Sequence, residues 1–409
     1  MQRTVRRANG ALGPLEPVLV GQDEEVTGRT LVITNDFPPR SGGIQSFVHG
    51  LLLRQDPDSV VVYAPKWKRA AEFDAEQSFP VIRHPRSLMV PEPTVLRRAR
   101  EIAKTYDCDR VLFGAAAPLG LLAPALRKSG LERSVAITHG HEAGWAKMPG
   151  TRQLLRRIGQ GVDTITYLGE YTRERIADAL TPEAAARMRR LVPGVDDELF
   201  NPRNKSDGDA VRAELGLADR PVVVCVSRLM PRKGQDTLIR AMPAIKQKIP
   251  GAALLIVGGG PYRGHLEGLV KSERLDDDVV ITGGVPFAVL PAHYAAGDVF
   301  AMPCRTRNHG FDVEGLGIVY LEAAATGMAA IAGNSGGAPD AVIPGETGFV
   351  VDGDSIGESA NAVTKLLGER DLAAQFGNAG RQWVESNWRW PHVAARLTML
   401  LDGQDPDAV

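Results

Sequence analysis

Short runs of β-branched residues alternate with amphipathic stretches along almost the whole chain, and this alternation constrains the fold more than any other feature. It is typical of parallel sheets covered by helices. The sequence therefore predicts an α/β fold built from doubly wound, Rossmann-like units. The strand candidates are 29–35, 59–64, 110–114, 134–139 and 164–168 in the first half, and 221–227, 253–258, 279–283, 299–301 and 329–334 in the second.

A length of 409 residues favours two domains over one. A polar, turn-rich segment begins at Asn201, and we place the domain boundary there. Pro391 interrupts the last helical stretch, so we expect the final helix to return to the first domain. The expected organisation is a flexible extension at 1–28, a first unit at 29–205 joined by the helix at 391–409, and a second unit at 206–390.

The composition, with 44% hydrophobic and 24% charged residues, is that of a globular protein without a membrane span. No run approaches the roughly 20 apolar residues that cross a bilayer. The first residues lack the apolar segment of a secretory signal, and the three cysteines have no metal-like spacing. We therefore expect a cytoplasmic protein, and we expect no nucleic-acid partner.

The net charge of −1 hides an asymmetry between the two halves. Residues 29–205 contain 27 lysines and arginines against 20 aspartates and glutamates, whereas residues 206–409 contain 18 against 25. A basic half joined to an acidic half suggests that one face meets an anionic partner.

The segment from Glu314 to Glu322 (EGLGIVYLE) places two carboxylates across a Gly-x-Gly turn that opens an apolar helix. Their spacing is a little over two helical turns, so both can contact one elongated ligand at different heights. The amides that enter the helix at Ile318 favour a phosphate between them. A carboxylate on each side of a diphosphate suggests hydroxyl-rich groups at both ends, which describes a sugar nucleotide.

Two further loops at predicted strand ends favour the same ligand. Arg228 and Lys233 surround a proline turn after the strand at 221–227, where they can offer two cations to a diphosphate leaving group. Gly42 and Gly43 follow the first strand and begin a helix, which is where doubly wound domains bind phosphate. A solvated basic loop and a structural turn are the alternative readings.

His139 ends another predicted strand and can hydrogen-bond a sugar hydroxyl or stabilise developing positive charge. It could also form a metal site with His141 and Glu142, or be purely structural, but neighbours on a strand point to opposite faces. The glycines at 258–260 and 283–284 close two strands and fit packing against a purine, with main-chain groups around Val285 at its edge; tight turns alone are the alternative reading. No Asp-x-Asp motif lies near these loops, so we expect no essential metal.

Taken in order, these motifs resemble the retaining glycosyltransferases of family 4 over roughly residues 29–400. The segment 193–196, followed by Phe200 and Pro202, is also similar to that family. The resemblance implies a GT-B fold, in which two Rossmann-like domains face each other across a cleft and the C-terminal one holds the donor. A narrower resemblance, carried by 227–238 (SRLMPRKGQDTL) and 312–322 (DVEGLGIVYLE), is to the actinobacterial phosphatidylinositol mannoside synthases.

That narrower resemblance implies GDP-mannose as donor and phosphatidylinositol monomannoside as acceptor, with a glucuronosyl diacylglycerol as a further acceptor. It also implies the transfer of the second mannose at the cytoplasmic membrane face, with a divalent metal at most stimulatory. One departure from the family pattern is the segment 309–311 (HGF), where a glycine-richer loop is expected before Asp312.

The resemblance also assigns roles to residues of this chain. Glu314 would hold the mannose hydroxyls and Glu322 the ribose, and attack would come from the front face without a carboxylate nucleophile. The catalytic set is His139, Arg228, Lys233 and Glu314. The donor-binding set is Gly43, Arg228, Lys233, Val285, Glu314, Gly315, Leu316, Gly317, Ile318, Val319 and Glu322, and the acceptor-binding set is Asp36, Gly42 and His139.

A lipid acceptor would explain the excess of basic residues in the first half of the chain. The segments 66–69 (KWKR) and 93–106 mix cations with Trp and aliphatic residues. A solvated helix face is one reading of these segments, and reversible docking to an anionic membrane is the other.

For the whole chain, the alternatives to a mannosyltransferase are a family 4 enzyme with a UDP-sugar donor, a sugar-nucleotide epimerase and a non-catalytic sugar-nucleotide sensor.

Overall fold

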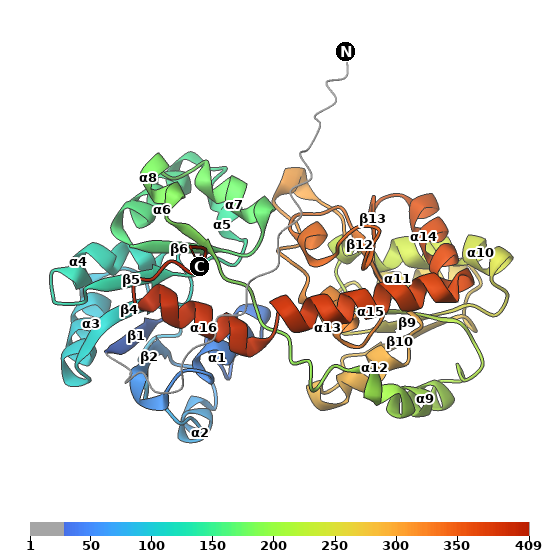
Figure 1. Ribbon diagram of the computed structural model, residues 1–409, viewed down its shortest axis with the longest axis horizontal. Helices are drawn as coiled ribbons and strands as arrows, with labels where there is room; N and C mark the ends of the chain where they lie inside the picture. Colours follow the sequence, from blue (N-terminus) through green and yellow to red (C-terminus); the bar gives the residue numbers. More distant parts are fainter. Residues whose placement is uncertain (1–27, 409) are drawn as a thin grey trace, which may run out of the picture.

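A computed structural model describes residues 28–408, which form two α/β units side by side along the long axis of the molecule (Figure 1). The extension expected at 1–28 lies, apart from Gly28, outside the described residues. The predicted fold class of two doubly wound units is confirmed.

The first unit contains a seven-stranded sheet in the order β3-β2-β1-β4-β5-β6-β7, and every strand pair in it is parallel. Its central strands are almost fully buried, as expected for a sheet covered on both faces. The strands are β1 (Arg29–Ile33), β2 (Val60–Pro65), β3 (Val81–His84), β4 (Cys108–Phe113), β5 (Arg133–Ala136), β6 (Thr164–Tyr167) and β7 (Met188–Arg190).

The second unit contains a six-stranded parallel sheet in the order β10-β9-β8-β11-β12-β13. Its strands are β8 (Val222–Val226), β9 (Ala253–Val257), β10 (Val279–Gly283), β11 (Val299–Met302), β12 (Ala330–Gly333) and β13 (Gly348–Val351). In both sheets the strand order reverses direction once, at β1/β4 and at β8/β11. Ligands of such sheets bind beyond the strand carboxyl ends at these points.

Helices connect the consecutive strands, except β12 and β13, which are joined through a 3₁₀ turn, and they cover both faces of each sheet. In the first unit they are α1 (Gly43–Leu52), α2 (Ala70–Ala75), α3 (Pro93–Thr105), α4 (Ala123–Arg127), α5 (Glu142–Trp145), α6 (Pro149–Gly161), α7 (Glu170–Ala177) and α8 (Pro182–Ala186). The later helices are α9 (Lys205–Glu214), α10 (Gln235–Lys248), α11 (Arg263–Ser272), α12 (Leu290–Ala295), α13 (Ile318–Ala325), α14 (Ile356–Gly368), α15 (Arg370–Asn387) and α16 (Trp390–Leu401). Among these residues, no helix combines the length and the apolar character that a bilayer span needs.

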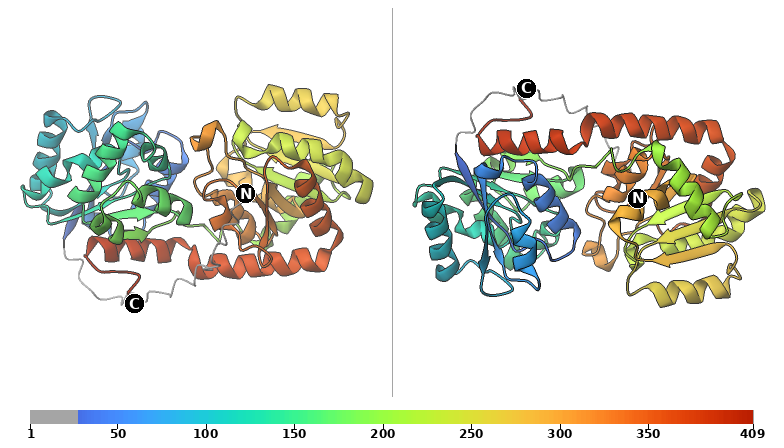
Figure 2. Two further views of the ribbon diagram at one scale, coloured as in Figure 1. Left: turned by 90° about the horizontal axis from the view of Figure 1, so that it is seen from above. Right: turned by 90° about the horizontal axis from the view of Figure 1, so that it is seen from below.

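The chain passes between the units twice. Phe200 already packs against the rings of Tyr294 and Phe287 in the second unit, and α9 packs against α12. The first passage therefore runs through 191–200, before the polar segment where we placed the boundary. The second passage lies between α15 and α16, where Pro391 occupies the first turn of α16 and that helix packs against α1 and β5 (Figure 2).

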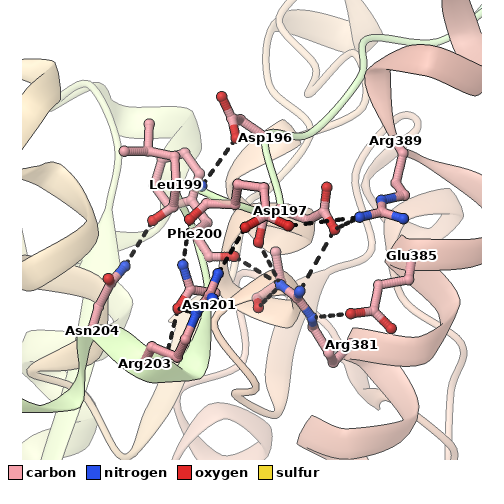
Figure 3. Close-up of polar contacts among 12 residues, drawn as sticks. Asp196, Asp197, Leu199, Phe200, Asn201, Arg203, Asn204, Arg381, Glu385 and Arg389 are labelled. Carbon is pink, nitrogen blue, oxygen red and sulfur yellow. Dashed lines mark hydrogen bonds and ion pairs between the residues drawn. The ribbon is translucent and has the colours of Figure 1, made fainter.

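The two passages are bonded to each other (Figure 3). The Val195 N–H donates to the Trp388 carbonyl at 2.7 Å, and the buried Asp197 carboxylate lies 2.7 Å from the Arg389 guanidinium. Arg381 of α15 donates to the carbonyls of Asp197 and Phe200. Both passages are therefore held by the second unit, next to the cleft between the sheets.

Candidate active site

A cavity of about 440 Å³ lies between the carboxyl ends of the two sheets and is lined by both units and by both chain passages. Because a cleft at this place is where paired doubly wound units bind ligands, it is the candidate active site. The structure brings together here the following residues predicted from the sequence: Gly43, His139, Glu314, Gly315, Leu316, Gly317, Ile318 and Glu322.

Helix α13 presents its N-terminus to this cavity. Gly317 precedes it with φ 81°, and a Cβ added there would lie 2.5 Å from the Tyr320 ring. Tyr320 is itself fixed, because its hydroxyl donates to the Met302 carbonyl at the end of β11 at 2.6 Å. The turn therefore requires glycine, and it directs the first N–H groups of the helix toward an anion in the cavity.

Glu314 forms a buried ion pair at the start of this turn. Its Oε2 lies 2.6 Å from Nζ of Lys233, and the two residues are 7% and 8% exposed. A third charged group, Arg232, lies 3.8 Å from Glu314 and 3.5 Å from Asp312. We did not predict Arg232, although it adjoins Lys233 in the same proline turn. Three charged side chains thus meet beside the N-terminus of α13.

Glu322 lies on the first turns of α13 and has a different environment. The Tyr294 hydroxyl donates to its Oε2 at 2.6 Å. Burial raises the pKa of the Glu322 carboxyl to about 7, although the hydrogen bond from Tyr294 lowers it. Tyr294 could not have been found from a motif, because it comes from α12 and reaches Glu322 only through the fold. Among residues 28–408 no cation pairs with Glu322, so its carboxylate is available to accept hydrogen bonds from ligand hydroxyls.

His139 enters the cavity from the first unit. Its Nε2 donates to the Gly114 carbonyl beyond β4 at 2.6 Å, which leaves Nδ1 unprotonated in the neutral ring. Burial lowers the pKa of His139, and the charge of Glu142 opposes that shift. The imidazole is therefore a neutral, oriented group at the switch point of the first sheet.

Glu142 organises the turn that carries His139. It is fully buried, accepts the His139 N–H at 3.0 Å and lies 3.3 Å from Nε2 of His141. Throughout 28–408 no cluster of three or more His, Cys, Asp or Glu side chains is arranged to hold a metal ion. The arrangement at 139–142 is a hydrogen-bonded turn.

The start of α1 faces the same cavity with open space. A Cβ added to Gly43 would meet no atom within 4 Å, whereas one on Gly42 would lie 2.2 Å from the Gln45 side chain. Gln45 in turn donates to the Asp36 carboxylate at 2.7 Å. Asp36 and Gly42 therefore build the loop before α1 without lining the cavity, and Gly43 leaves room in it.

The remaining predicted residues lie around the cavity without lining it. Arg228 is exposed beyond β8, and the structure records no ion pair for it within the described part of the chain. Lys233 reaches the site through Glu314, and Val319 belongs to the first turn of α13. Val285 is half-buried beyond β10, where the Gly258 N–H donates to the Gly283 carbonyl at 2.8 Å.

Comparisons with known proteins agree with this geometry. Residues 41–199 match the family model described as Glycosyltransferase Family 4, and residues 207–383 match the one described as Glycosyl transferases group 1. Over 387 residues the chain is 51% identical to the GDP-mannose-dependent alpha-(1-6)-phosphatidylinositol monomannoside mannosyltransferase of Mycobacterium tuberculosis, covering 92% of this chain and 99% of the relative. The chain belongs to the family 4 GT-B glycosyltransferases.

Other glycosyltransferases support both the assignment and the fold. A Corynebacterium glutamicum relative, the GDP-mannose-dependent monoacylated alpha-(1-6)-phosphatidylinositol monomannoside mannosyltransferase, is 45% identical over 379 residues, 92% of this chain and 98% of the relative. The crystal structure of Anabaena Alr3699/HepE in complex with UDP covers 92% of this chain and 100% of its own with a TM-score of 0.76. At 18% identity that structure shows the fold alone.

Proposed function

We propose that this glycosyltransferase is a retaining α-mannosyltransferase that moves mannose from GDP-mannose to phosphatidylinositol monomannoside, giving the dimannoside. The high identity to enzymes named for this activity, over nearly their full length, supports the substrates. The observation that carries the reaction class is the single cavity that joins Glu314, Glu322 and the N-terminus of α13 to His139 and Gly43.

In this proposal each wall of the cavity binds one part of the reactants. The N–H groups at the start of α13, with Lys233 and Arg228, bind the diphosphate, and Val285 lies beside the base. Glu314 accepts hydrogen bonds from the mannose hydroxyls and Glu322 from the ribose. The two carboxylates face opposite ends of one elongated donor, while Gly43 leaves space for the acceptor and His139 lies against the mannose.

The proposed transfer proceeds by front-face attack. The bond from the mannose anomeric carbon to the β-phosphate oxygen breaks, and an acceptor hydroxyl oxygen bonds to the same face of that carbon. The departing phosphate oxygen takes the proton of the attacking hydroxyl, and the nearby cations stabilise its charge. Retaining glycosidases instead use two carboxylates about 5 Å apart across the scissile bond. Isolation of a covalent mannosyl-enzyme would exclude this scheme.

Incubation of the protein with GDP-mannose and phosphatidylinositol monomannoside tests the function. We expect a dimannoside product and release of GDP, without a requirement for added metal. An epimerised nucleotide, or binding without turnover, would replace this proposal by one of the alternatives. Thermal-shift measurements with GDP, UDP and ADP test the donor separately: stabilisation by UDP alone would overturn the guanine assignment.

We also propose that the first unit docks on the inner face of the plasma membrane. Trp67, Leu88 and Val90 are 39%, 57% and 40% exposed, and they sit in the loops after β2 and β3. The Lys66 N–H joins these loops by donating to the Arg86 carbonyl at 3.1 Å. Exposed apolar tips among cations are typical of groups that enter an anionic interface.

The same surface adjoins the acceptor side of the cleft. Asn35, at the end of β1, exchanges two hydrogen bonds with the backbone of Met89, so the loop carrying Leu88 and Val90 is tied to the loop before α1. Arg40 of that second loop lies 5.4 Å from the Trp67 ring. A lipid acceptor held at this rim would have its headgroup beside the cavity, which supports a peripheral membrane location.

A further inference from the structure

The two units touch at a second place, apart from the chain passages. Lys147, two residues beyond α5, extends its Nζ to the carbonyls of His309 and Gly310 in the second unit, at 3.1 and 2.8 Å. The same Nζ lies 4.9 Å from the centre of the Phe311 ring. A Cβ on Gly310, where φ is 82°, would lie 2.5 Å from this Nζ. The HGF segment that departs from the family pattern is therefore the part of the loop that meets the first unit.

This loop leads directly to the candidate donor site. Arg307 and Asp312 pair across its base in a short antiparallel bridge. Asp312 lies 3.5 Å from Arg232, which in turn lies 3.8 Å from Glu314. The second unit thus holds the base of the loop, and Lys147 of the first unit holds its tip.

A second charged side chain crosses in the opposite direction. Asp340, in the 3₁₀ turn Ala338–Ala341, reaches the N-terminus of α7 in the first unit. Helix α7 is preceded by Gly169, and a Cβ there would lie 2.0 Å from Oδ2 of Asp340. The backbone N–H groups of Tyr171 and Glu170 in the first turn of α7 lower the pKa of the carboxyl. Asp340 therefore lies beside the N-terminus of α7, where the glycine that precedes the helix has no side chain of its own.

Asp340 also interacts electrostatically with a buried cation, Arg190. Burial raises the pKa of Asp340 to about 6, and the Arg190 charge opposes that shift, so the carboxylate is ionised at neutral pH. Arg190 is buried against the Trp388 ring, 4.8 Å from its centre, with Nε and Nη2 lacking a hydrogen-bond partner within the described residues. A charge of each unit thus lies at complementary backbone dipoles of the other unit: Lys147 donates to two carbonyls, and Asp340 lies beside the N-terminus of α7.

Both contacts flank the point where the two walls of the cavity approach each other. The Gly337 N–H donates to the Glu314 carbonyl at 2.9 Å, so the turn that carries Asp340 is bonded to the donor loop. A Cβ on Gly140 would lie 3.4 Å from Cα of Gly315, and one on Gly315 would lie 3.3 Å from the His139 carbonyl. The backbone at 139–140 therefore meets the backbone at 314–315 between the two charged contacts.

We propose that Lys147 and Asp340 are positioning residues for glycosyl transfer, which hold the two units closed so that His139 lies against the Glu314 turn. The role rests on the proposed function, because it is the reaction that needs both walls. Neither residue lines the cavity. Their loss should therefore lower turnover more than it weakens nucleotide binding to the second unit, and it should loosen the closed arrangement.

The test compares Lys147→Met, Asp340→Ala and the double variant with Lys128→Met, a matched exposed lysine at the end of α4. We expect each single variant to lower kcat roughly 10-fold with little change in the Kd for GDP, because closure assembles the site. The double variant should lose at least the product of the two single losses, because separate contacts add in the free energy of one closure. Lys128→Met should match the wild type.

Small-angle X-ray scattering of the same proteins without ligand separates closure from activity. We expect a larger radius of gyration in Lys147→Met and Asp340→Ala than in the wild type and Lys128→Met. An unchanged radius of gyration, or an unchanged kcat in both single variants, would overturn the proposal. If the wild type transferred no mannose, the scattering comparison would still decide whether the two residues hold the units together. If Asp340→Ala fails to fold, Lys147→Met still tests the proposal, because Lys147 is only half-buried and its replacement should leave the protein folded.

Discussion

The two helix starts that face the cavity use glycine in different ways. At α13, Gly317 has a left-handed conformation against the Tyr320 ring, and the adjacent Glu314 is paired with Lys233 in a buried site. At α1, a side chain on Gly43 would enter empty space. The second unit therefore presents a tightly built surface to the ligand, and we call this surface, around Glu314 and Gly317, the tight wall. The first unit presents an open surface around Gly43, which we call the open wall.

This difference fits the two proposed ligands. A nucleoside diphosphate has a fixed shape and charge, and preorganised charges bind such a group most effectively. A glycolipid acceptor enters from a membrane and needs space beside the cleft. Substitutions in the second unit should therefore reduce both stability and activity, whereas substitutions at the start of α1 should reduce activity alone.

The largest effect is expected from removing the buried cation of the tight wall. Lys233→Met removes the nearer of the two cations beside the buried Glu314 carboxylate and leaves Arg232 at 3.8 Å, which we expect to cost up to about 3–5 kcal/mol in the free energy of unfolding. Loss of one charge at the diphosphate should lower kcat/KM by about 10²–10³-fold. Denaturant unfolding and steady-state kinetics measure the two effects.

Lys205→Met is the matched control for that experiment. Lys205 pairs with Asp209 at the same 2.6 Å distance, but both side chains are 58% exposed. Exposed ion pairs contribute about 0–1 kcal/mol, so this variant should retain nearly full stability and activity. Equal losses in the two variants would contradict a special role for the buried pair.

Gly317 and Gly43 give the most direct test of the difference between the two helix starts. Gly317→Ala forces an unfavourable φ and a contact with Tyr320, so we expect a loss of about 1–3 kcal/mol in stability together with weaker GDP binding. Gly43→Ala should leave the melting temperature unchanged and lower transfer about 10-fold or more, because the methyl group occupies ligand space. A melting temperature that fell equally in both variants would remove the distinction between the two walls.

Sequence reasoning located the tight wall better than the open one, and central strands better than edges. All three strands that we did not predict, β3, β7 and β13, lie at sheet edges, where one side is unpaired and β-branched runs are shorter. For example, β7 is only Met188-Arg-Arg. The buried central strands carry the continuous apolar runs that make prediction possible.

The site residues divide in the same way. Glu314, Gly317 and Glu322 were predictable because local spacing on one turn and helix brings them together. Tyr294 and Asp340 were not, because their partners lie on other elements and are brought near only by the packing of the fold. Arg228 shows the opposite case: its motif is clear, yet it is exposed and does not line the cavity.

A smaller effect is expected from pH at the tight wall. Because the pKa of Glu322 is about 7, and ribose hydroxyls donate to the ionised form, nucleotide binding should release a proton. The Kd for GDP should therefore rise about 10-fold between pH 8 and pH 6. Glu322→Gln should bind GDP more weakly and without this dependence, as isothermal titration across the pH range would show.

The same carboxyl affects stability with a definite sign. Its folded-state pKa of about 7 lies above the value of about 4.5 in the unfolded chain, so the folded state binds the extra proton between these values. The free energy of unfolding should therefore fall as pH rises from 4.5 to 7. At pH 8 Glu322→Gln should be more stable than the wild type; a less stable variant would show that burial does not penalise the ionised carboxylate.

The smallest effect per residue is expected on the open wall, where we propose that the first unit meets lipid. Each exposed cation near an anionic surface contributes about 1 kcal/mol, so Lys68→Gln, beside Trp67, should weaken binding to phosphatidylinositol-containing vesicles about fivefold. Arg98→Gln is the matched control, because Arg98 is exposed on α3 and already paired with Glu101 at 3.0 Å. Vesicle sedimentation at low and high salt measures both. Weaker binding in Arg98→Gln alone would move the docking surface from the cleft rim to α3, and no change in either variant would remove membrane docking through these cations.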